Sequence, residues 1–316
     1  MLNKPSIGIT IGDPSGIGPE VTLKAISRLT PSQISSILVI GDGNALSRVA
    51  GLRKIKFELI DLKNIRGANF AFGKISPIFG RCSVEYLEKY LELFKRKSIN
   101  ALVTAPISKE AINLAGFKFP GHTEFLAKKT NTRKFAMMFV AGKLKVALVT
   151  RHISLSEVPR EINQKKISDT IILTVDFLKK YYRLKSPRIA LCGLNPHAGE
   201  DGLLGKEEDR IIKPAIAKAK SYAKFIFGPL SSDTVFLKSH RNRFDAIIAM
   251  YHDQGMIPVK TLSFDTAVNV TLGLPFVRTS PCHGTAFDIA GKNIANPYPM
   301  LSAIQLAISL SKKSLC

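Results

Sequence analysis

The sequence lacks the features that mark secreted and membrane-spanning proteins. Its four cysteines form neither a CxxC pair nor the spacing of a disulfide framework, and they are Cys82, Cys192, Cys282 and Cys316. Thiols in such a pattern are expected to be reduced, as in the cytosol. The N-terminus has no uninterrupted apolar segment like that of a signal peptide, and no apolar run approaches the roughly 18 residues of a membrane-spanning helix. We therefore expect a cytoplasmic protein.

Acidic residues are also scarce, because 24 Asp and Glu face 46 Lys and Arg, which gives a formal net charge of +22. A basic chain raises the question of nucleic acid. However, the lysines are scattered along predicted helices, and the sequence has no arginine-rich stripe, zinc-finger spacing or aromatic-basic RNA-binding pattern. The charge favours a well-solvated surface that attracts small anionic molecules. A basic nucleic-acid-binding protein stays as the non-enzyme alternative.

Neither standard glycine loop for nucleotides occurs, since GxGxxG and GxxxxGK[ST] are both absent. The segment GITIGDPSGIGPE, residues 8–20, instead leads from a predicted strand through a glycine-rich turn into a predicted helix. Such glycines can let backbone amides approach an anion at the helix start, or they can serve the backbone alone. Both interpretations stay open, and Asp13 is the polar candidate of this segment.

Apolar segments alternate with helical patterns along the whole chain. Strands are predicted at 6–12, 36–41, 100–105, 135–141, 145–150, 188–194, 245–251 and 267–273, and helices near 19–29, 82–96, 164–182, 205–223 and 299–312. Strands that are apolar on both faces and separated by helices are typical of a mixed, mostly parallel sheet flanked by helices. The sequence therefore predicts an α/β fold, and its 316 residues suit two lobes.

Three of the six histidines follow predicted strands, namely His152 in VALVTRHIS, His197 in IALCGLNPHAGEDG and His252 in DAIIAMYHDQG. In open α/β sheets, ligands bind at the carboxyl ends of the strands. Three imidazoles gathered there suit one divalent metal with an open coordination position. Asp253, and Asp233 in GPLSSDTVF, are candidates for orienting these histidines, although Asp233 or its neighbouring serines could instead cap a helix. We predict a metal-assisted enzyme.

A second group of polar residues suits a substrate that carries phosphate or carboxylate. Lys260, Asn269 and Arg278 are spaced through otherwise apolar sequence, and together they form a credible anion clamp. His122 and Thr123 lie in PGHTEFLA, where a loop turns into a helix. Thr123 is a plausible N-cap. His122 taken alone is more typical of a capping or surface residue.

The ordered motifs resemble one family over almost the whole chain. HGTAFDIAGKNIANP, which begins at His283, resembles the cofactor-binding loop of the isocitrate and isopropylmalate dehydrogenase superfamily, which binds a nicotinamide dinucleotide without the glycine fingerprint. GDPSGIGPE, TAPISKE, PGHTEFLA, NPHAGEDG, GPLSSDT and YHDQG resemble the 4-hydroxythreonine-4-phosphate dehydrogenase family in particular. That family oxidises 4-phosphooxy-L-threonine with NAD in vitamin B6 (pyridoxine) biosynthesis.

The resemblance implies a role for each candidate residue. Metal ligands fall on His152, His197 and His252, and substrate-binding residues fall on His122, Thr123, Lys260, Asn269 and Arg278. The implied contacts of the NAD loop are His283, Gly284, Thr285, Asp288, Gly291 and Asn296. NADP stays an alternative cofactor, although Asp288 would disfavour a nearby 2′-phosphate. The catalytic candidates are Lys260, as a proton acceptor, and Asp253. The metal is one divalent ion per site, with zinc, magnesium and cobalt as candidates.

The resemblance also implies a homodimer that shares its active site between subunits, in a two-lobed fold with the site in the cleft. We place a discontinuous cofactor-binding lobe at 1–125 and 256–316, and a metal and dimerisation lobe at 126–255. The expected reaction oxidises the C3 hydroxyl of 4-phosphooxy-L-threonine to 2-amino-3-oxo-4-phosphooxybutanoate, which decarboxylates to 3-amino-2-oxopropyl phosphate. The alternative is a related dehydrogenase of 4-phospho-D-threonate or -erythronate, whose substrate lacks the amino group.

Overall fold

The structure is a computed structural model that describes residues 6–50, 55–65 and 70–314, so the cysteine at position 316 lies outside it. In these residues the other three cysteines are free thiols, and Cys192 is fully buried in strand β7 (Ile189–Cys192). Within the same ranges, no helix is long and apolar enough to cross a membrane.

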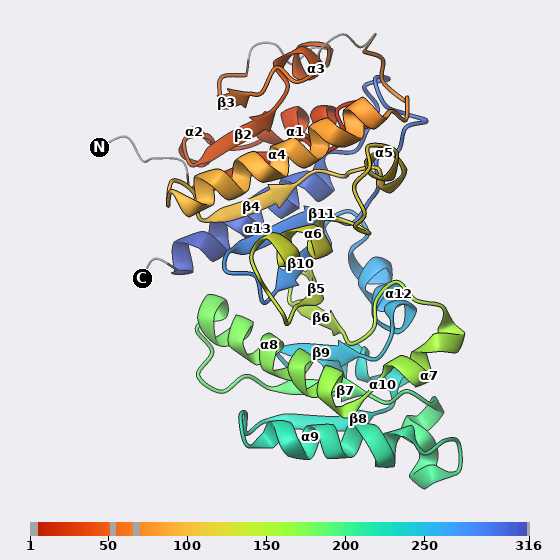
Figure 1. The fold of residues 1–316 in the computed structure, drawn as a ribbon. Coiled ribbons are helices and arrows are strands. Elements are labelled where there is room, and N and C mark those ends of the chain that lie inside the picture. The colour runs from red at the N-terminus through yellow and green to blue at the C-terminus, as the bar shows by residue number, and fades with distance from the viewer. Residues whose placement is uncertain (1–5, 51–54, 66–69, 315–316) are drawn as a thin grey trace. The chain divides into compact units, whose positions relative to one another are not determined.

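The chain divides into two compact units. Unit 1 contains Met1–Thr132 and Leu274–Cys316, and unit 2 contains Arg133–Gly273. The boundaries placed from the sequence differ from this division, because they assign 126–132 to the metal lobe and 256–273 to the cofactor lobe. Each unit is a sheet of mostly parallel strands with helices packed on it, which confirms the predicted α/β class (Figure 1).

Unit 1 has five described strands in the order β3-β2-β1-β4-β11, and all neighbours in this order are parallel. Figure 1 shows α4 in front of these strands and α13 behind them, which explains why β1 and β4 are buried at every residue. The strands are β1 (Ile7–Thr10), β2 (Ile37–Gly41), β3 (Glu58–Asp61), β4 (Ala101–Thr104) and β11 (Val277–Pro281). The helices are α1 (Gly18–Ile26), α2 (Pro31–Ile34), α3 (Gly43–Ser47), α4 (Pro77–Lys95), α5 (Lys109–Leu114), α6 (His122–Lys129) and α13 (Tyr298–Ser314).

Unit 2 has six described strands in the order β10-β5-β6-β9-β7-β8, antiparallel from β10 to β6 and parallel from β6 to β8. The strands are β5 (Ala136–Ala141), β6 (Leu144–Leu148), β7 (Ile189–Cys192), β8 (Ile226–Leu230), β9 (Ala246–Ala249) and β10 (Val268–Leu272). The α-helices are α7 (Val158–Glu161), α8 (Gln164–Tyr182), α9 (Lys213–Lys220), α10 (Ser232–Val235), α11 (Lys238–Arg241) and α12 (His252–Ser263). A 3₁₀ turn at Leu155–Glu157, a turn at Pro196–Gly202 with left-handed backbone inside it, and a π turn at Glu208–Ile212 complete the described part of the unit.

The parallel strands place the candidate residues at shared edges. In unit 2, the carboxyl ends of β6, β7, β8 and β9 point the same way, and the chain continues from them to His152, His197, Asp233 and His252 respectively. In unit 1, the carboxyl end of β1 leads to Asp13 and that of β11 leads to His283. This arrangement is the one on which the sequence interpretation depended.

Several elements differ from the predictions. Strands β3, β8 and β11 were not predicted, because ELID is only partly buried and IFGPL and VRTSP contain proline or polar residues that weaken a strand pattern. The helix predicted at 205–223 is divided into the π turn and α9. The N-cap of α6 is Gly121, so the prediction that Thr123 caps this helix is wrong.

Candidate active site

His152 and His252 lie side by side in unit 2. Their ring centroids are 5.5 Å apart, and the rings meet edge to face at 67°. They come together because β6 and β9 are parallel neighbours. Thr150 joins the two strand ends, since its backbone N–H and its hydroxyl both donate to the carbonyl of Met250, at 3.1 and 2.7 Å. Two of the three predicted metal ligands therefore meet within one chain.

Asp253 fixes one side of the His252 ring. The distance from His252 Nδ1 to Asp253 Oδ1 is 2.7 Å, and the His252 side chain is 37% exposed. With Nδ1 occupied by a carboxylate, Nε2 remains for a ligand. Histidines that bind metals commonly hold their second nitrogen in this way, because the carboxylate sets the tautomer and the ring orientation.

His197 lies in an unusual left-handed turn. Five consecutive residues, from His197 through Asp201, have φ between 42° and 85°. For residues with a Cβ this conformation costs roughly 1–2 kcal/mol each, so other contacts must hold the turn. Glu208 is the main brace, since it is 2% exposed and its Oε1 accepts from the backbone N–H groups of Leu194 and Asn195 at 2.7 and 2.8 Å. This role of Glu208 was not predicted from the sequence.

Gln254 connects the other strand ends, whereas Asp233 is bonded within its own turn. The Ser231 hydroxyl donates to Asp233 Oδ1 at 2.6 Å, and this bond, with a smaller contribution from nearby His197, lowers the pKa of Asp233. Ser231 therefore bonds Asp233 rather than capping the backbone of α10. The Gln254 amide donates to the carbonyl of Gly193 and to the hydroxyl of Ser232, both at 2.8 Å. Gln254 was also missed, because only the fold brings these partners together.

The described residues of one chain do not form a complete metal site. No group of three or more His, Cys, Asp or Glu side chains in this part of the chain is close enough to hold an ion. His152 and His252 fit a divalent metal as two neutral imidazole ligands, with Asp253 behind one of them. A metal at this pair requires further ligands from elsewhere.

Unit 1 contains a buried cation beside a neutral histidine. Arg278 on β11 is 3% exposed, and its Nη2 donates to Thr104 Oγ1 at 2.6 Å. Burial lowers the pKa of Arg278 to about 10, so its guanidinium keeps its charge at neutral pH. Burial and the nearby Arg278 lower the pKa of His122 well below its usual value. A neutral imidazole and a buried cation can together bind an anionic group.

Three of the predicted binding residues have hydrogen-bonding capacity that is not used. His122 Nε2, His283 Nε2 and Asn269 Oδ1 are buried, yet none has a hydrogen-bond partner among the described residues. Buried polar atoms of this kind require an explanation, and a bound ligand is one. The interpretation of His122 as a surface residue is therefore wrong, because its Nε2 is buried. Thr123 is buried next to His122, whereas Lys260 is exposed on α12.

The predicted NAD loop, residues 283–296, is partly exposed. Gly284, Asp288, Gly291 and Asn296 are exposed, and a Cβ at Gly291, where φ is +79°, would lie 2.7 Å from the Phe72 ring. Burial lowers the pKa of His283, whose Nδ1 lies 3.0 Å from the carbonyl of Gly284. The exposed edge offers polar groups to a dinucleotide, and glycine is required where the loop packs closely.

The glycine-rich turn after β1 serves the backbone. At Gly12, φ is +72° and a Cβ would lie 2.1 Å from the carbonyl oxygen of Pro106, so only glycine fits. The N–H of Ile17 donates to the carbonyl of Thr285 at 2.9 Å, which occupies one amide that an anion could have used. Asp13 is fully buried, and its Oδ1 accepts from the backbone N–H and the hydroxyl of Ser15. Burial raises the pKa of Asp13 to about 6.

Residues 23–307 match the family described as pyridoxal phosphate biosynthetic protein PdxA. The chain belongs to the PdxA family. A relative named 4-hydroxythreonine-4-phosphate dehydrogenase, from Desulforapulum autotrophicum, is 41% identical over 96% of this chain and 95% of its own length. A relative named D-threonate 4-phosphate dehydrogenase, from Cupriavidus necator, is 42% identical over 98% of both chains. This PdxA-family chain is therefore an oxidoreductase whose relatives divide between two substrates.

Solved structures place the PdxA family within a broader fold. The crystal structure of 4-hydroxythreonine-4-phosphate dehydrogenase from Klebsiella pneumoniae matches with a TM-score of 0.88 and 37% identity, over 97% of this chain and 99% of that one. Isocitrate dehydrogenase from Methylococcus capsulatus matches with a TM-score of 0.50 and 15% identity, over 98% of this chain and 88% of that one, which shows likeness of fold alone. The predicted isocitrate dehydrogenase-like fold is confirmed.

Proposed function

We propose that this PdxA-family dehydrogenase oxidises the C3 hydroxyl of 4-phosphooxy-L-threonine with NAD and one divalent metal ion. The observation that carries the proposal is the His152–His252 pair, 5.5 Å apart between ring centroids, with Asp253 bonded to His252. The geometry of this pair suits a metal that binds the substrate hydroxyl. The buried Arg278 suits an anionic group such as phosphate or carboxylate.

The reaction has a simple balance. The hydride at C3 moves to the nicotinamide of NAD, and the hydroxyl gives up its proton, so the alcohol becomes a ketone. A divalent ion at the histidine pair would supply Lewis-acid polarisation of that hydroxyl. The product, 2-amino-3-oxo-4-phosphooxybutanoate, is a β-keto acid, and loss of carbon dioxide gives 3-amino-2-oxopropyl phosphate.

The chain's own residues orient the reactants. Asp253 holds His252 at Nδ1, Glu208 holds the turn that carries His197, and Arg278 would pair with phosphate or carboxylate. Lys260 lies eight residues after His252 on α12, which is about 12 Å along a helix axis. This spacing favours a phosphate contact for Lys260 over proton transfer at the hydroxyl next to His252. His122, Thr123 and Asn269 would complete the substrate contacts, and residues 283–296 would contact NAD.

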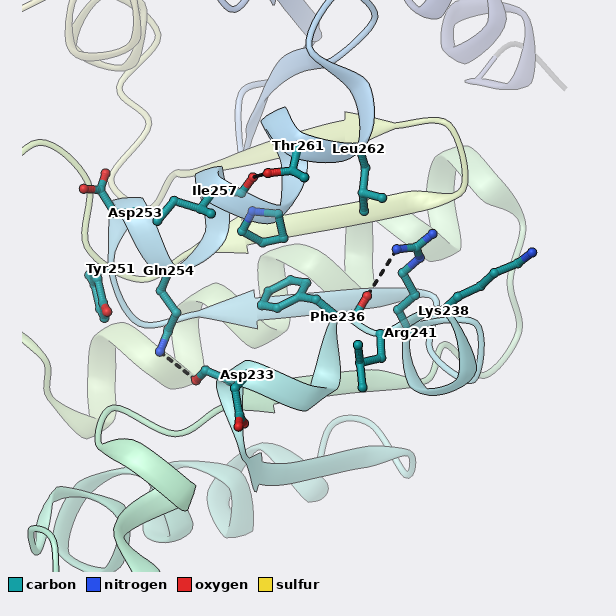
Figure 2. Close-up of a pocket in the computed structure, with 13 residues that line it drawn as sticks. Asp233, Phe236, Lys238, Arg241, Tyr251, Asp253, Gln254, Ile257, Thr261 and Leu262 are labelled. Carbon is teal, nitrogen blue, oxygen red and sulfur yellow. Dashed lines mark hydrogen bonds between the residues drawn. The ribbon is translucent and has the colours of Figure 1, made fainter.

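We further propose that a second copy of the chain completes the site. A cavity of about 510 Å³ in unit 2 is lined by Asp253, the residue after His252, and by residues of α10, α11 and α12. Three of its lining residues, Leu237, Ile257 and Leu262, are 52%, 65% and 44% exposed. Figure 2 shows Asp233 and Asp253 toward one end of this cavity and Lys238 and Arg241 toward the other. An apolar surface with opposite charges at its ends is self-complementary, as a two-fold dimer requires. The partner would then supply the ligands that one chain lacks.

A second substrate has equal support from the relatives. Those named for D-threonate 4-phosphate are as similar to this chain as those named for 4-hydroxythreonine 4-phosphate, at 42% and 41% identity. The two substrates differ at C2, where the threonate has a hydroxyl in place of the amino group. NADH formation with each compound, measured side by side, separates them. A higher kcat/KM for 4-phosphooxy-L-threonine is expected, and a higher value for the threonate would assign the chain to the second group.

A further inference from the structure

Two side chains of helix α1 contact the far end of the 283–296 loop. Glu20 is 2% exposed, and its Oε1 accepts hydrogen bonds from the backbone N–H of Ala295 at 2.8 Å and from Lys24 Nζ at 2.7 Å. Lys24 Nζ also donates to the carbonyls of Asn293 at 2.9 Å and Ala295 at 3.3 Å. One ion pair therefore holds both the N–H and the carbonyl of Ala295.

The segment just before α1 contacts the beginning of the same loop. The N–H of Ile17 donates to the carbonyl of Thr285 at 2.9 Å. A Cβ at Gly16 would lie 3.0 Å from that carbonyl oxygen, so a larger residue would press on the loop. Residues 16–24 thus contact both ends of a loop that is partly exposed between them. This contact accounts for a glycine-rich turn that has no nucleotide-binding pattern.

The loop needs this support because its backbone is not relaxed. Ala286 has a φ of 42°, in the left-handed region that residues with a Cβ seldom adopt. Asn293 also lies in this region, with a φ of 59°, although asparagine enters it more readily than most residues. The carbonyl of Asn293 is one of the acceptors of Lys24. The next two residues lead to Asn296, a proposed contact of the dinucleotide. Because Glu20 is 2% exposed and Lys24 is 17% exposed, salt and solvent screen this ion pair less than they screen a pair on the open surface.

We propose that the Glu20–Lys24 pair is a positioning device that sets the conformation of the 283–296 loop and thereby the affinity for the dinucleotide. This inference rests on the proposed function for the role of the loop, but the contacts themselves do not depend on it. Neither residue touches the reacting atoms in this account. Their loss should therefore weaken NAD binding and leave the chemical step unchanged.

The test is Glu20→Gln, with Glu92→Gln as the matched control. Glutamine keeps an acceptor for the Ala295 N–H but loses the charge that holds Lys24. Glu92, which is 39% exposed on α4, pairs with Lys89 and Arg96 instead. Loss of a charged hydrogen bond should raise two quantities about tenfold: the amide hydrogen-exchange rates of residues 293–296 and the KM for NAD. The kcat and the KM for the phosphorylated substrate should change less than about twofold. The control should match wild type.

If Glu20→Gln has the same hydrogen exchange at residues 293–296 and the same KM for NAD as wild type, the proposal is wrong. If that variant does not fold, Lys24→Met carries the same comparison, since Lys24 is partly exposed and its loss leaves the Glu20–Ala295 bond in place. A wild-type protein that reduces no NAD would refute the proposed function, while the exchange comparison would still test the contacts.

Discussion

At the scale of single residues, the site combines groups whose charge is set by burial. Arg278 stays cationic and His122 stays neutral although both are buried, so an anionic ligand meets one charge and one neutral donor or acceptor. Asp13 is the contrasting case. Its Oδ2 has no partner among the described residues, and burial makes its ionised form unfavourable.

Asp13 should make stability depend on pH. Its pKa is about 6 in the folded protein against 3.8 for an ordinary aspartate, so the folded state binds the proton more tightly. Stability should therefore fall as pH rises from about 4 to 6 and should then level off. Asp13→Asn removes this titration, and the free energy of unfolding of wild type should lose about 3 kcal/mol relative to the variant across that window. Urea unfolding of both proteins at several pH values measures this difference. If the free energies of unfolding of wild type and Asp13→Asn change in parallel with pH, the prediction is wrong.

Two substitutions of Lys260 distinguish its two proposed roles, phosphate contact and proton transfer. Lys260→Arg keeps the positive charge but cannot act as a proton acceptor at neutral pH. If Lys260 contacts the phosphate, Lys260→Arg should keep kcat within about threefold, while Lys260→Met should raise the substrate KM roughly tenfold or more. A loss of kcat in Lys260→Arg comparable to that in Lys260→Met would instead assign it the proton. Steady-state kinetics at saturating NAD makes the comparison.

At the scale of elements, the close approach of α4 and α5 depends on one small residue. Gly80 lies inside α4, and a Cβ there would be 2.1 Å from the carbonyl oxygen of Ala111 on α5. Alanine normally stabilises a helix interior by about 1 kcal/mol relative to glycine. Gly80→Ala should nevertheless destabilise the protein by about 1–3 kcal/mol, because the helices must move apart. Arg81→Ala, at the exposed neighbouring position, is the control for chemical denaturation, and equal stability of Gly80→Ala and wild type would contradict the account.

The elements also show what could be predicted from the sequence. Helix α8 lies at the predicted residues 164–182, because its amphipathic pattern is uninterrupted and Asn163 caps it. Helix α12 was not predicted, because Gly255 and Pro258 lie inside it. The edge that carries the three histidines was predicted, since each histidine follows an apolar strand. The role of Glu208 could not be predicted, because its partners Asn195 and Leu194 lie 13 and 14 residues before it and only the left-handed turn brings them close.

At the scale of the whole molecule, the proposal requires two chains for one site. If His152 and His252 come from one chain and His197 from its partner, mixing His197→Ala with His252→Ala subunits should restore one intact site in each mixed dimer. Random exchange should then give about a quarter of wild-type activity. Mixing His152→Ala with His252→Ala should restore nothing, because both ligands belong to the same chain. Recovery in neither mixture, with dimers verified by size, would contradict a shared site.

A metal ion held by these histidines should be required for oxidation of the substrate by NAD. The most direct measurement is NADH absorbance with 4-phosphooxy-L-threonine before chelation, after chelation and after a divalent metal is added back, in wild type and His252→Ala. We predict that wild type loses activity on chelation and regains it with metal. His252→Ala should retain its circular dichroism spectrum but neither bind metal nor form NADH. Undiminished NADH formation by chelated wild type or by His252→Ala would contradict the account.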